Sequence, residues 1–308
     1  MVTPAIVQYR YQDQEATVLQ SIPLHDMTDP LVEPKTLWQW LSAAVPGVIV
    51  ADCRYRLTDP AAGYQLYQAG HIPGAYFLDL NRDLSGPPGV TGGGRHPLPD
   101  AAAFRRTMER LGLTPDHWVI AYDDEGSGAA RLWWLLKFYG HDRVAVLNGG
   151  YSGWVEAGFP TSRDVPSERA GQWQPSPRLE WVTSYDVVAS QRRHLTVIDA
   201  RAPERFRGEV EPIDPVAGHI PGAINVPYQS LMSGPARFPE KDALVARLPV
   251  LSPSRPVIYC GSGVSACVNV LAFYRVGRQP VLYAGSWSDW ISHPGALIER
   301  GEPKDHSR

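Results

Sequence analysis

The chain of 308 residues repeats one order of short motifs, and this repetition constrains its fold more than any other feature. Each half contains an Asp-x-Arg segment, then Gly-His-Ile-Pro-Gly-Ala, then two further Val/Ile-rich runs and a tryptophan. The matched positions are Asp52 and Asp199, 70–75 and 218–223, Asp123 and Cys260, and Trp154 and Trp290. Loop insertions between shared elements explain small differences in their spacing. The sequence therefore predicts two copies of one fold.

Each copy alternates short Val/Ile-rich runs with helical segments, a pattern typical of an α/β protein whose parallel strands are buried on both faces. We therefore predict two tandem domains, each a mainly parallel sheet flanked by helices. The predicted helices include 101–111, 129–139, 185–191 and 265–274. The proline- and glycine-containing segment 163–178 is interpreted as a linker. The predicted boundaries are an N-terminal extension 1–30, a first copy 31–162, a second copy 179–301 and a C-terminal tail 302–308.

Cys260 is the strongest candidate for a reactive residue. It directly follows the apolar run 256–259 and opens the loop Cys-Gly-Ser-Gly-Val-Ser at 260–265, before a predicted helix. Glycines that turn backbone N–H groups inward, together with a helix N-terminus, stabilise a thiolate. The alternative is a buried, unreactive thiol, which needs neither feature. The first copy carries Asp123 at the matching position, and a carboxylate cannot replace a nucleophilic thiolate, so we expect that copy to be catalytically silent.

Composition excludes several other classes of protein. The formal net charge is −3 and 44% of residues are hydrophobic, which is untypical of a disordered chain or a nucleic-acid-binding surface. The longest apolar stretches fall short of the roughly 18 residues that a membrane helix needs. The N-terminus lacks the pattern of a signal peptide, so we expect a cytoplasmic protein. Three cysteines, Cys53, Cys260 and Cys267, are a poor basis for a disulfide framework or a metal site, and no metal or cofactor is expected.

The loop at 260–265 is followed by Ala266 and Cys267, and Arg-Leu-Trp-Trp at 131–134 and Leu-Asn-Gly-Gly at 147–150 complete the pattern. From about residue 31 to 301 the chain resembles the tandem-domain rhodanese superfamily, and within it the 3-mercaptopyruvate sulfurtransferase family. This resemblance implies a silent N-terminal domain, an active C-terminal domain and a persulfide formed on Cys260. Related phosphatases carry an arginine six residues after the cysteine, where this chain has Ala266, so phosphatase activity is not expected.

The resemblance also assigns substrate-binding residues. Thiosulfate-specific rhodaneses carry basic side chains within the loop, and positions 261–265 hold none, which favours mercaptopyruvate. Arg205 matches the arginine that holds the mercaptopyruvate carboxylate in a two-pronged pair. Arg201 is a further candidate, although its position directly after a strand also suits an internal brace. The loop residues expected to contact substrate are Gly261, Gly263, Val264 and Ser265.

Two further features follow from the family pattern. A Ser/His/Asp relay that assists the carbonyl side of the substrate matches Ser262, His96 and Asp79. The second substrate-binding arginine of the family is absent, because position 214 is Asp. Either the second contact is missing and the affinity for mercaptopyruvate is reduced, or another residue such as Arg207 or Arg95 replaces that arginine.

These observations predict a sulfurtransferase that moves sulfane sulfur from 3-mercaptopyruvate through Cys260 to cyanide or to a thiol, such as a reduced thioredoxin or a small thiol, and releases pyruvate. No nucleic-acid or membrane partner is expected. The alternatives are a thiosulfate sulfurtransferase and a non-catalytic sulfur-binding regulatory module.

Overall fold

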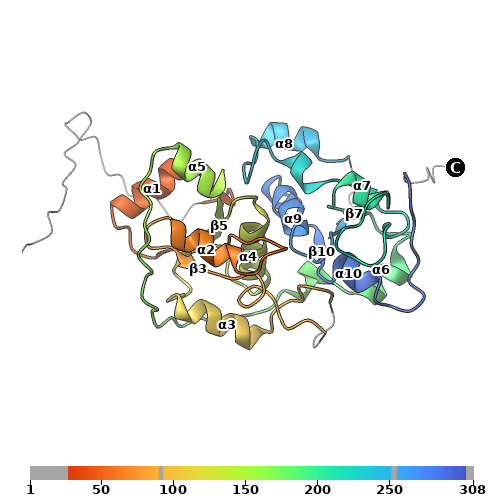
Figure 1. Cartoon of the computed structure of the whole chain (residues 1–308), viewed down its shortest axis with the longest axis horizontal. Coiled ribbons are helices and arrows are strands. Elements are labelled where there is room, and N and C mark those ends of the chain that lie inside the picture. The colour runs from red at the N-terminus through yellow and green to blue at the C-terminus, as the bar shows by residue number, and fades with distance from the viewer. Residues whose placement is uncertain (1–26, 90–92, 251–254, 303–308) are drawn as a thin grey trace, which may run out of the picture.

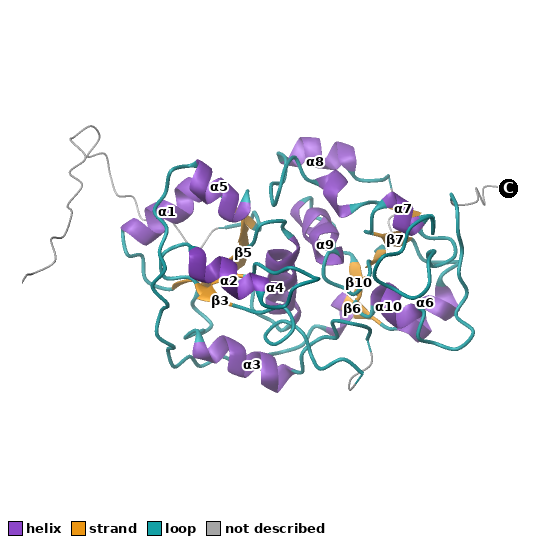
Figure 2. Cartoon of the chain, in the orientation of Figure 1, coloured by secondary structure: helices purple, strands orange, loops and turns teal. Residues whose placement is uncertain are grey.

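A computed structural model describes residues 27–89, 93–250 and 255–302. Two α/β halves lie side by side along the long axis of the molecule (Figure 1), and each half has strands at its centre and helices around them (Figure 2). This arrangement confirms the predicted fold class of two tandem domains with mainly parallel sheets. Within the described ranges, no helix is both long and apolar enough to cross a membrane.

The first copy contains a five-stranded sheet in the order β1-β5-β4-β2-β3, and every strand pairing in it is parallel. Its strands are β1 (Leu31–Val32), β2 (Val48–Asp52), β3 (Tyr76–Phe77), β4 (Trp118–Tyr122) and β5 (Val144–Leu147). Its helices are α1 (Pro34–Ser42), α2 (Ala62–Ala69), α3 (Ala101–Arg110), α4 (Ser127–Phe138) and α5 (Gly150–Glu156).

The second copy repeats this arrangement with a parallel sheet in the order β6-β10-β9-β7-β8. Its strands are β6 (Val182–Thr183), β7 (Val197–Asp199), β8 (Ile224–Asn225), β9 (Val257–Tyr259) and β10 (Val281–Tyr283). Its helices are α6 (Tyr185–Gln191), α7 (Pro203–Phe206), α8 (Lys241–Arg247), α9 (Ala266–Arg275) and α10 (Ser286–Trp290), with short 3₁₀ helices η2 (Leu179–Trp181) and η3 (Tyr228–Leu231). Corresponding strands thus occupy the same places in both sheets, which confirms the predicted repeat.

The central strand of each sheet places the matched residues Asp123 and Cys260. Strand β4 ends at Tyr122 and β9 ends at Tyr259, so each residue lies at the carboxyl end of the middle strand, before a helix. Ligand sites of parallel sheets lie at this edge. The fold therefore presents two equivalent loops, one in each copy.

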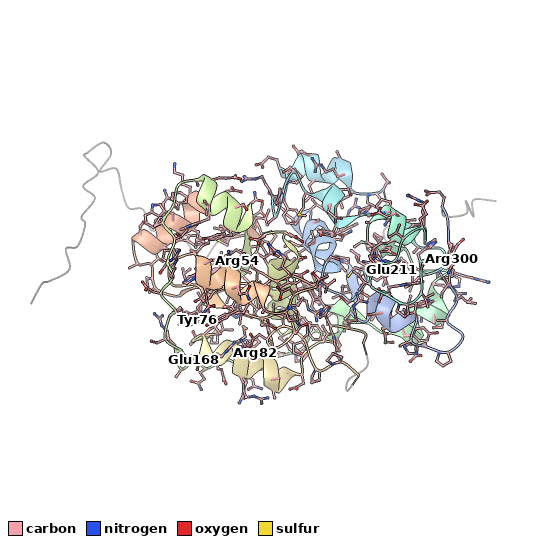
Figure 3. The ribbon with its side chains drawn as sticks, in the orientation of Figure 1. Arg54, Tyr76, Arg82, Glu168, Glu211 and Arg300 are labelled. Atoms are coloured by element: carbon pink, nitrogen blue, oxygen red, sulfur yellow. The ribbon has the colours of Figure 1, made fainter. Side chains whose placement is uncertain are left out.

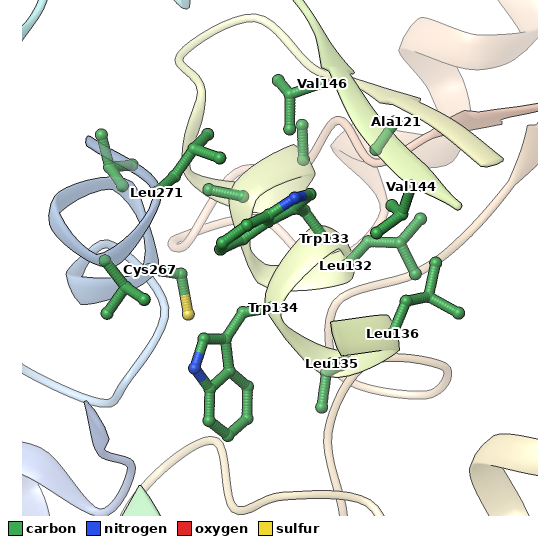
Figure 4. Packing of buried hydrophobic residues seen from close by; sticks show 14 of the residues in the cluster. Ala121, Leu132, Trp133, Trp134, Leu135, Leu136, Val144, Val146, Cys267 and Leu271 are labelled. Atoms are coloured by element: carbon green, nitrogen blue, oxygen red, sulfur yellow. The ribbon is translucent and has the colours of Figure 1, made fainter. Parts of the chain in front are cut away.

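The two copies share one hydrophobic core. Every residue of α4 is buried, because one side of this helix packs on its own sheet and another side on α9 of the second copy. Figure 4 shows Trp133 and Leu132 on α4 between the sheet residue Val144 and the α9 residues Cys267 and Leu271. The helix is mostly apolar apart from Ser127, Arg131 and Lys137, as is typical of a fully buried helix. The α4–α9 contact thus holds the two loops in a defined relation.

Four predicted helices are observed within one or two residues of their expected ends, at α3, α4, α6 and α9. The segment 163–178 contains neither helix nor strand, and its backbone N–H groups at Arg169 and Gly171 donate to carbonyls of the first copy. The boundaries of the domains remain predictions. The extension 1–30 and the tail 302–308 lie almost entirely outside the described residues.

Candidate active site

The loop after β9 wraps its backbone around the Cys260 sulfur. Gly263 has a positive φ of 77°, and a Cβ at this position would lie 2.2 Å from the carbonyl oxygen of Ala284, so only glycine fits. In this conformation the Gly263 N–H donates to Cys260 Sγ at 3.1 Å. The start of α9 directly follows. The predicted anion-binding nest is therefore present around the sulfur.

Cys260 differs from the other two cysteines in its electrostatic environment. All three thiols are buried and none forms a disulfide. Burial raises the pKa of Cys260, but the Ser265 hydroxyl and the backbone N–H groups of the loop outweigh it, and the pKa falls below its ordinary value. Burial instead raises the pKa of Cys53, and it raises the pKa of Cys267 to about 12. Cys260 alone of the three has the surroundings of a reactive thiolate.

The equivalent loop of the first copy holds a carboxylate in its nest. Asp123 accepts hydrogen bonds from the N–H groups of Gly126 at 2.6 Å, Gly128 at 2.7 Å and Ala129 at 3.4 Å. Gly126 also has a positive φ, of 92°, and lies 137 positions before Gly263. Burial raises the pKa of Asp123 to about 7, although these N–H donors lower it. The first copy therefore fills its nest with its own side chain.

The first copy contributes His96 to the site of the second. His96 Nδ1 and Ser262 Oγ form a hydrogen bond of 2.7 Å, and both residues are buried. Burial, together with the charges of the nearby Arg131 and Arg95, lowers the pKa of His96 to about 4. The imidazole is therefore neutral at physiological pH. The structure thus brings together two of the three predicted relay residues.

Arg131 on α4 connects the two copies at the reactive loop. Its Nη1 donates to the Gly263 carbonyl at 3.0 Å, and its Nη2 donates to the carbonyls of His96 at 3.1 Å and Pro97 at 3.2 Å. The side chain is fully buried. One arginine of the first copy therefore positions both the cysteine loop and the segment that carries His96. Sequence reasoning used Arg131 only as a mark of resemblance, because its partners are distant in the chain.

A small cavity of about 70 Å³ opens onto Cys260. Arg205, on α7, and Arg95, from the first copy, both line it. Arg205 donates to Glu211 from Nε at 3.2 Å and from Nη2 at 2.6 Å, and to Asp214 from Nη2 at 3.2 Å. The remaining lining residues combine the loop with apolar and aromatic side chains: Tyr55, Leu57, His96, Ile213, Gly261, Ser262, Val264 and Ser265.

A wider cavity of about 370 Å³ adjoins the first and shares Tyr55, Leu57, Arg205 and Ser265 with it. Residues of both copies line it, including Glu125 and Tyr228. Tyr55 and Leu57 were not among the sequence candidates, since they lie in the first copy and no motif marks them. Cys260 lines the smaller cavity and not this wider one.

The Arg201 guanidinium makes mainly internal contacts, although the residue also lines the wider cavity. Its guanidinium donates to Asp199 at 2.6 Å, to the Gly218 carbonyl at 2.7 Å and to Glu211 at 3.3 Å, and only 1% of the side chain is exposed. Arg54 makes the equivalent contacts with Asp52 and Gly70 in the first copy. Figure 3 labels Arg54 in one half and Glu211 in the other. These contacts fit the internal brace, and a substrate contact of Arg201 at the wider cavity stays a prediction.

Asp79 is also placed differently from the expectation. One of its carboxylate oxygens, Oδ1, accepts the N–H groups of Asn81 and Arg82, each at 2.8 Å. Asp79 lines a separate cavity of the first copy, next to Arg82, and among the described residues it forms no hydrogen bond with His96. Local turn chemistry engages this carboxylate, because a short Asp side chain readily accepts N–H groups two and three residues on. The predicted third member of the relay is therefore a turn-stabilising residue.

Comparison with known proteins agrees with this geometry. The family model described as the rhodanese-like domain matches residues 33–157 and 185–293. A probable 3-mercaptopyruvate sulfurtransferase of Pseudomonas aeruginosa is 45% identical over 83% of this chain and 94% of its own length. A Mycobacterium tuberculosis protein provisionally named a thiosulfate sulfurtransferase is 42% identical over 82% of this chain and 91% of its own length.

Among solved structures, the 3-mercaptopyruvate sulfurtransferase from Leishmania major superposes with a TM-score of 0.77 at 29% identity, over 87% of this chain and 75% of that one. The two segments matched by the family model contain four of the five strands of each sheet, together with the loops that begin at Asp123 and Cys260. The chain belongs to the rhodanese-like family, with one such domain in each half.

Proposed function

We propose that this protein is a 3-mercaptopyruvate sulfurtransferase that forms a persulfide on Cys260 and passes the sulfur to a thiol or to cyanide. The observation that carries this proposal is the lowered pKa of the buried Cys260 thiol, in a nest that opens onto a small cavity lined by Arg205. A reactive cysteine needs both features, an ionised sulfur and access for the donor.

In the first half-reaction the Cys260 thiolate attacks the sulfur of 3-mercaptopyruvate while Arg205 binds the carboxylate. A sulfur–sulfur bond forms and the carbon–sulfur bond breaks, and its electron pair becomes the enolate of pyruvate. The Ser262 hydroxyl, hydrogen-bonded to the neutral His96, stabilises the enolate oxygen, and protonation of the enolate carbon yields pyruvate. The Cys260 persulfide remains.

In the second half-reaction a thiolate acceptor enters through the wider cavity and attacks the outer sulfur of the persulfide. The bond between the two sulfurs breaks, the acceptor leaves as its own persulfide, and Cys260 returns to the thiolate. With cyanide the product is thiocyanate. We propose a cytoplasmic small thiol or a reduced thioredoxin as the acceptor, which is consistent with three free cysteines.

Charge in the cavity favours mercaptopyruvate over thiosulfate as the donor. The loop itself contributes no basic side chain at 261–265. The nearby cations Arg205 and Arg95 are each paired with a carboxylate, from Glu211 and Asp214. A compact dianion gains little from cations that are already paired, whereas a carboxylate needs only free guanidinium donors at one end. Thiosulfate remains the second candidate donor because the relative from Mycobacterium tuberculosis bears that name.

Intact-mass measurement and kinetics on one preparation test the proposal. Treatment with 3-mercaptopyruvate should add one sulfur, about 32 daltons, to the wild type and none to Cys260→Ser, because only a thiolate accepts sulfane sulfur. Cys53→Ser serves as the control and should retain the adduct. Retention of the adduct in Cys260→Ser would mean that another residue accepts the sulfur. A higher kcat/KM for thiosulfate than for mercaptopyruvate would mean that thiosulfate is the preferred donor.

A further inference from the structure

We propose that Arg95, contributed by the silent first copy, is the second carboxylate-binding residue of the active site, and that Asp214 positions it. This inference rests on the proposed function, since it concerns how the same donor is held. Arg95 would take the place of the arginine that the family pattern predicts near position 214, where this chain has Asp.

The Arg95 and Arg205 guanidinium groups converge on the same point of the cysteine loop. A Cβ built on Gly261 would lie 3.0 Å from Arg95 Nη2 and 3.6 Å and 3.7 Å from Arg205 Nη2 and Nη1. Both arginines line the cavity that contains Cys260. The two guanidinium groups therefore lie close to each other, next to the residue that follows the nucleophile.

Asp214 holds these two cations together. One of its carboxylate oxygens pairs with Arg95 Nη1 and the other accepts from Arg205 Nη2 at 3.2 Å, and only 2% of its side chain is exposed. Two adjacent guanidinium groups repel each other unless an anion lies between them. Asp214 supplies that anion from the side, so both arginines can stay near Gly261 in the absence of substrate.

Arg95 keeps free donors for a ligand. Its Nε is buried and has no hydrogen-bond partner among the described residues, and its Nη2 donates to none of them. Arg205 Nη1 likewise makes no hydrogen bond within the described ranges. An unsatisfied buried donor is costly, and a carboxylate of the substrate would satisfy these groups.

The backbone before Arg95 is fixed against the second copy. The Arg95 N–H donates to Ser288 Oγ at 3.1 Å, and the Gly93 N–H donates to Asp289 Oδ1 at 3.3 Å. A Cβ on Gly94 would lie 2.5 Å from the Gly285 carbonyl oxygen, so this close approach requires glycine. These contacts anchor Arg95 at the mouth of the cavity. Arg207, the other candidate, pairs instead with Glu209 and Glu302 and does not line the cavity.

Two donors that differ only in the carboxylate test the proposal. Mercaptoacetone has the same ketone and thiol as 3-mercaptopyruvate, with a methyl group in place of the carboxylate. In Arg95→Gln, kcat/KM for mercaptopyruvate should fall by about 10- to 100-fold, mostly through KM, because hydrogen bonds to a charged group are lost. The kcat/KM for mercaptoacetone should stay within about twofold. Arg95→Lys should recover part of the loss, since it keeps the charge but not the fork.

Arg207→Gln is the matched control and should leave both donors unaffected. Equal losses for both donors in Arg95→Gln would mean that Arg95 only joins the two copies, and no loss for either would mean that it does not touch substrate. Either result would overturn the inference while leaving the proposed function intact. Failure of the wild type to turn over mercaptopyruvate would instead overturn the proposed function, and the inference with it.

Discussion

The loop at 123–129 of the first copy and the loop at 260–266 of the second have the same backbone design and different contents. Both follow the central strand, both use a glycine with positive φ three residues on, and both direct N–H groups inward. Asp123 satisfies those groups permanently, whereas Cys260 leaves a sulfur that faces a cavity. The same loop conformation is therefore a structural element when its first residue is Asp and a candidate reactive site when its first residue is Cys.

The first copy is nevertheless part of the active site. His96 bonds to Ser262, Arg131 bonds to the Gly263 carbonyl, and Arg95 lines the cavity at Cys260. These contacts come from a domain that has no nucleophile of its own at the matching position. The difference between the copies is thus one of role, with one copy supplying the sulfur atom and the other supplying much of its surroundings.

The largest expected effect comes from breaking the link between the copies. Arg131→Met should lower the free energy of unfolding by about 4 kcal/mol, because several buried carbonyls lose their donor. It should also lower kcat/KM about tenfold, since the cysteine loop and His96 lose their common support. Urea unfolding and steady-state kinetics measure both effects.

Arg106→Met, on the exposed face of α3, is the control and should change stability by less than about 0.5 kcal/mol. Equal stability of the Arg131 variant and this control would mean that the two copies do not depend on the buried guanidinium.

The second effect separates the two nests. Asp123→Ala should cost about 3 kcal/mol of unfolding free energy, because the N–H groups of Gly126, Gly128 and Ala129 lose their acceptor. Cys260→Ala should change stability by less than about 1 kcal/mol and abolish activity. A stability loss in Cys260→Ala as large as that in Asp123→Ala would contradict the division into a structural and a reactive nest.

The stability difference between the wild type and Asp123→Ala should also depend on pH. The folded-state pKa of Asp123, about 7, lies above the ordinary value of 3.8, so folding favours the protonated acid. The stability that this shift contributes is complete below pH 3.8 and is lost as the pH rises through about 7. The stability advantage of the wild type over Asp123→Ala should therefore be larger at pH 5 than at pH 8. An advantage that grows with pH would mean that the carboxylate is ionised in the nest.

The smallest expected effect concerns the Ser265 hydroxyl, a hydrogen-bond donor that only the loop of the second copy has. Ser265 stabilises the Cys260 thiolate through its hydroxyl, and the matching position of the first copy is Gly128. In Ser265→Ala the pKa of Cys260 should rise, so alkylation by iodoacetamide should slow several-fold at neutral pH and converge with the wild type at alkaline pH. Ser190→Ala, exposed on α6, is the matched control. An unchanged pH profile would show that the backbone N–H groups lower the pKa of Cys260 without help from the Ser265 hydroxyl.

Features that depend on neighbouring residues were predictable. The strand before Cys260 and the glycine turn at 261–263 lie within a few residues of each other, and their patterns are local. The helix at 127–138 was also predicted from its own residues, within two positions of its ends. Transfer by motif position was less secure, since Asp79 is engaged by the turn at Asn81 and Arg82, and Arg201 by Asp199.

Contacts between distant residues could not be predicted in this way. His96 and Ser262 are 166 positions apart, and Arg95 and Asp214 are 119 positions apart. No spacing rule relates such pairs, because their distance depends on how one copy docks on the other. Position 214 illustrates this, since the sequence alone shows only a missing arginine, whereas the structure shows another arginine paired with the residue that replaces it.

The sequence by itself determined that this protein has two copies of an α/β domain and that Cys260 opens a glycine loop after a buried strand, because strands, glycine turns and the identity of a side chain are properties of short segments. Only the tertiary structure decided that the site is built from both copies, since the packing of α4 on α9 brings Arg131, His96 and Arg95 to the sulfur. That packing buries apolar surface shared by the two halves, and its geometry is a property of the folded chain as a whole.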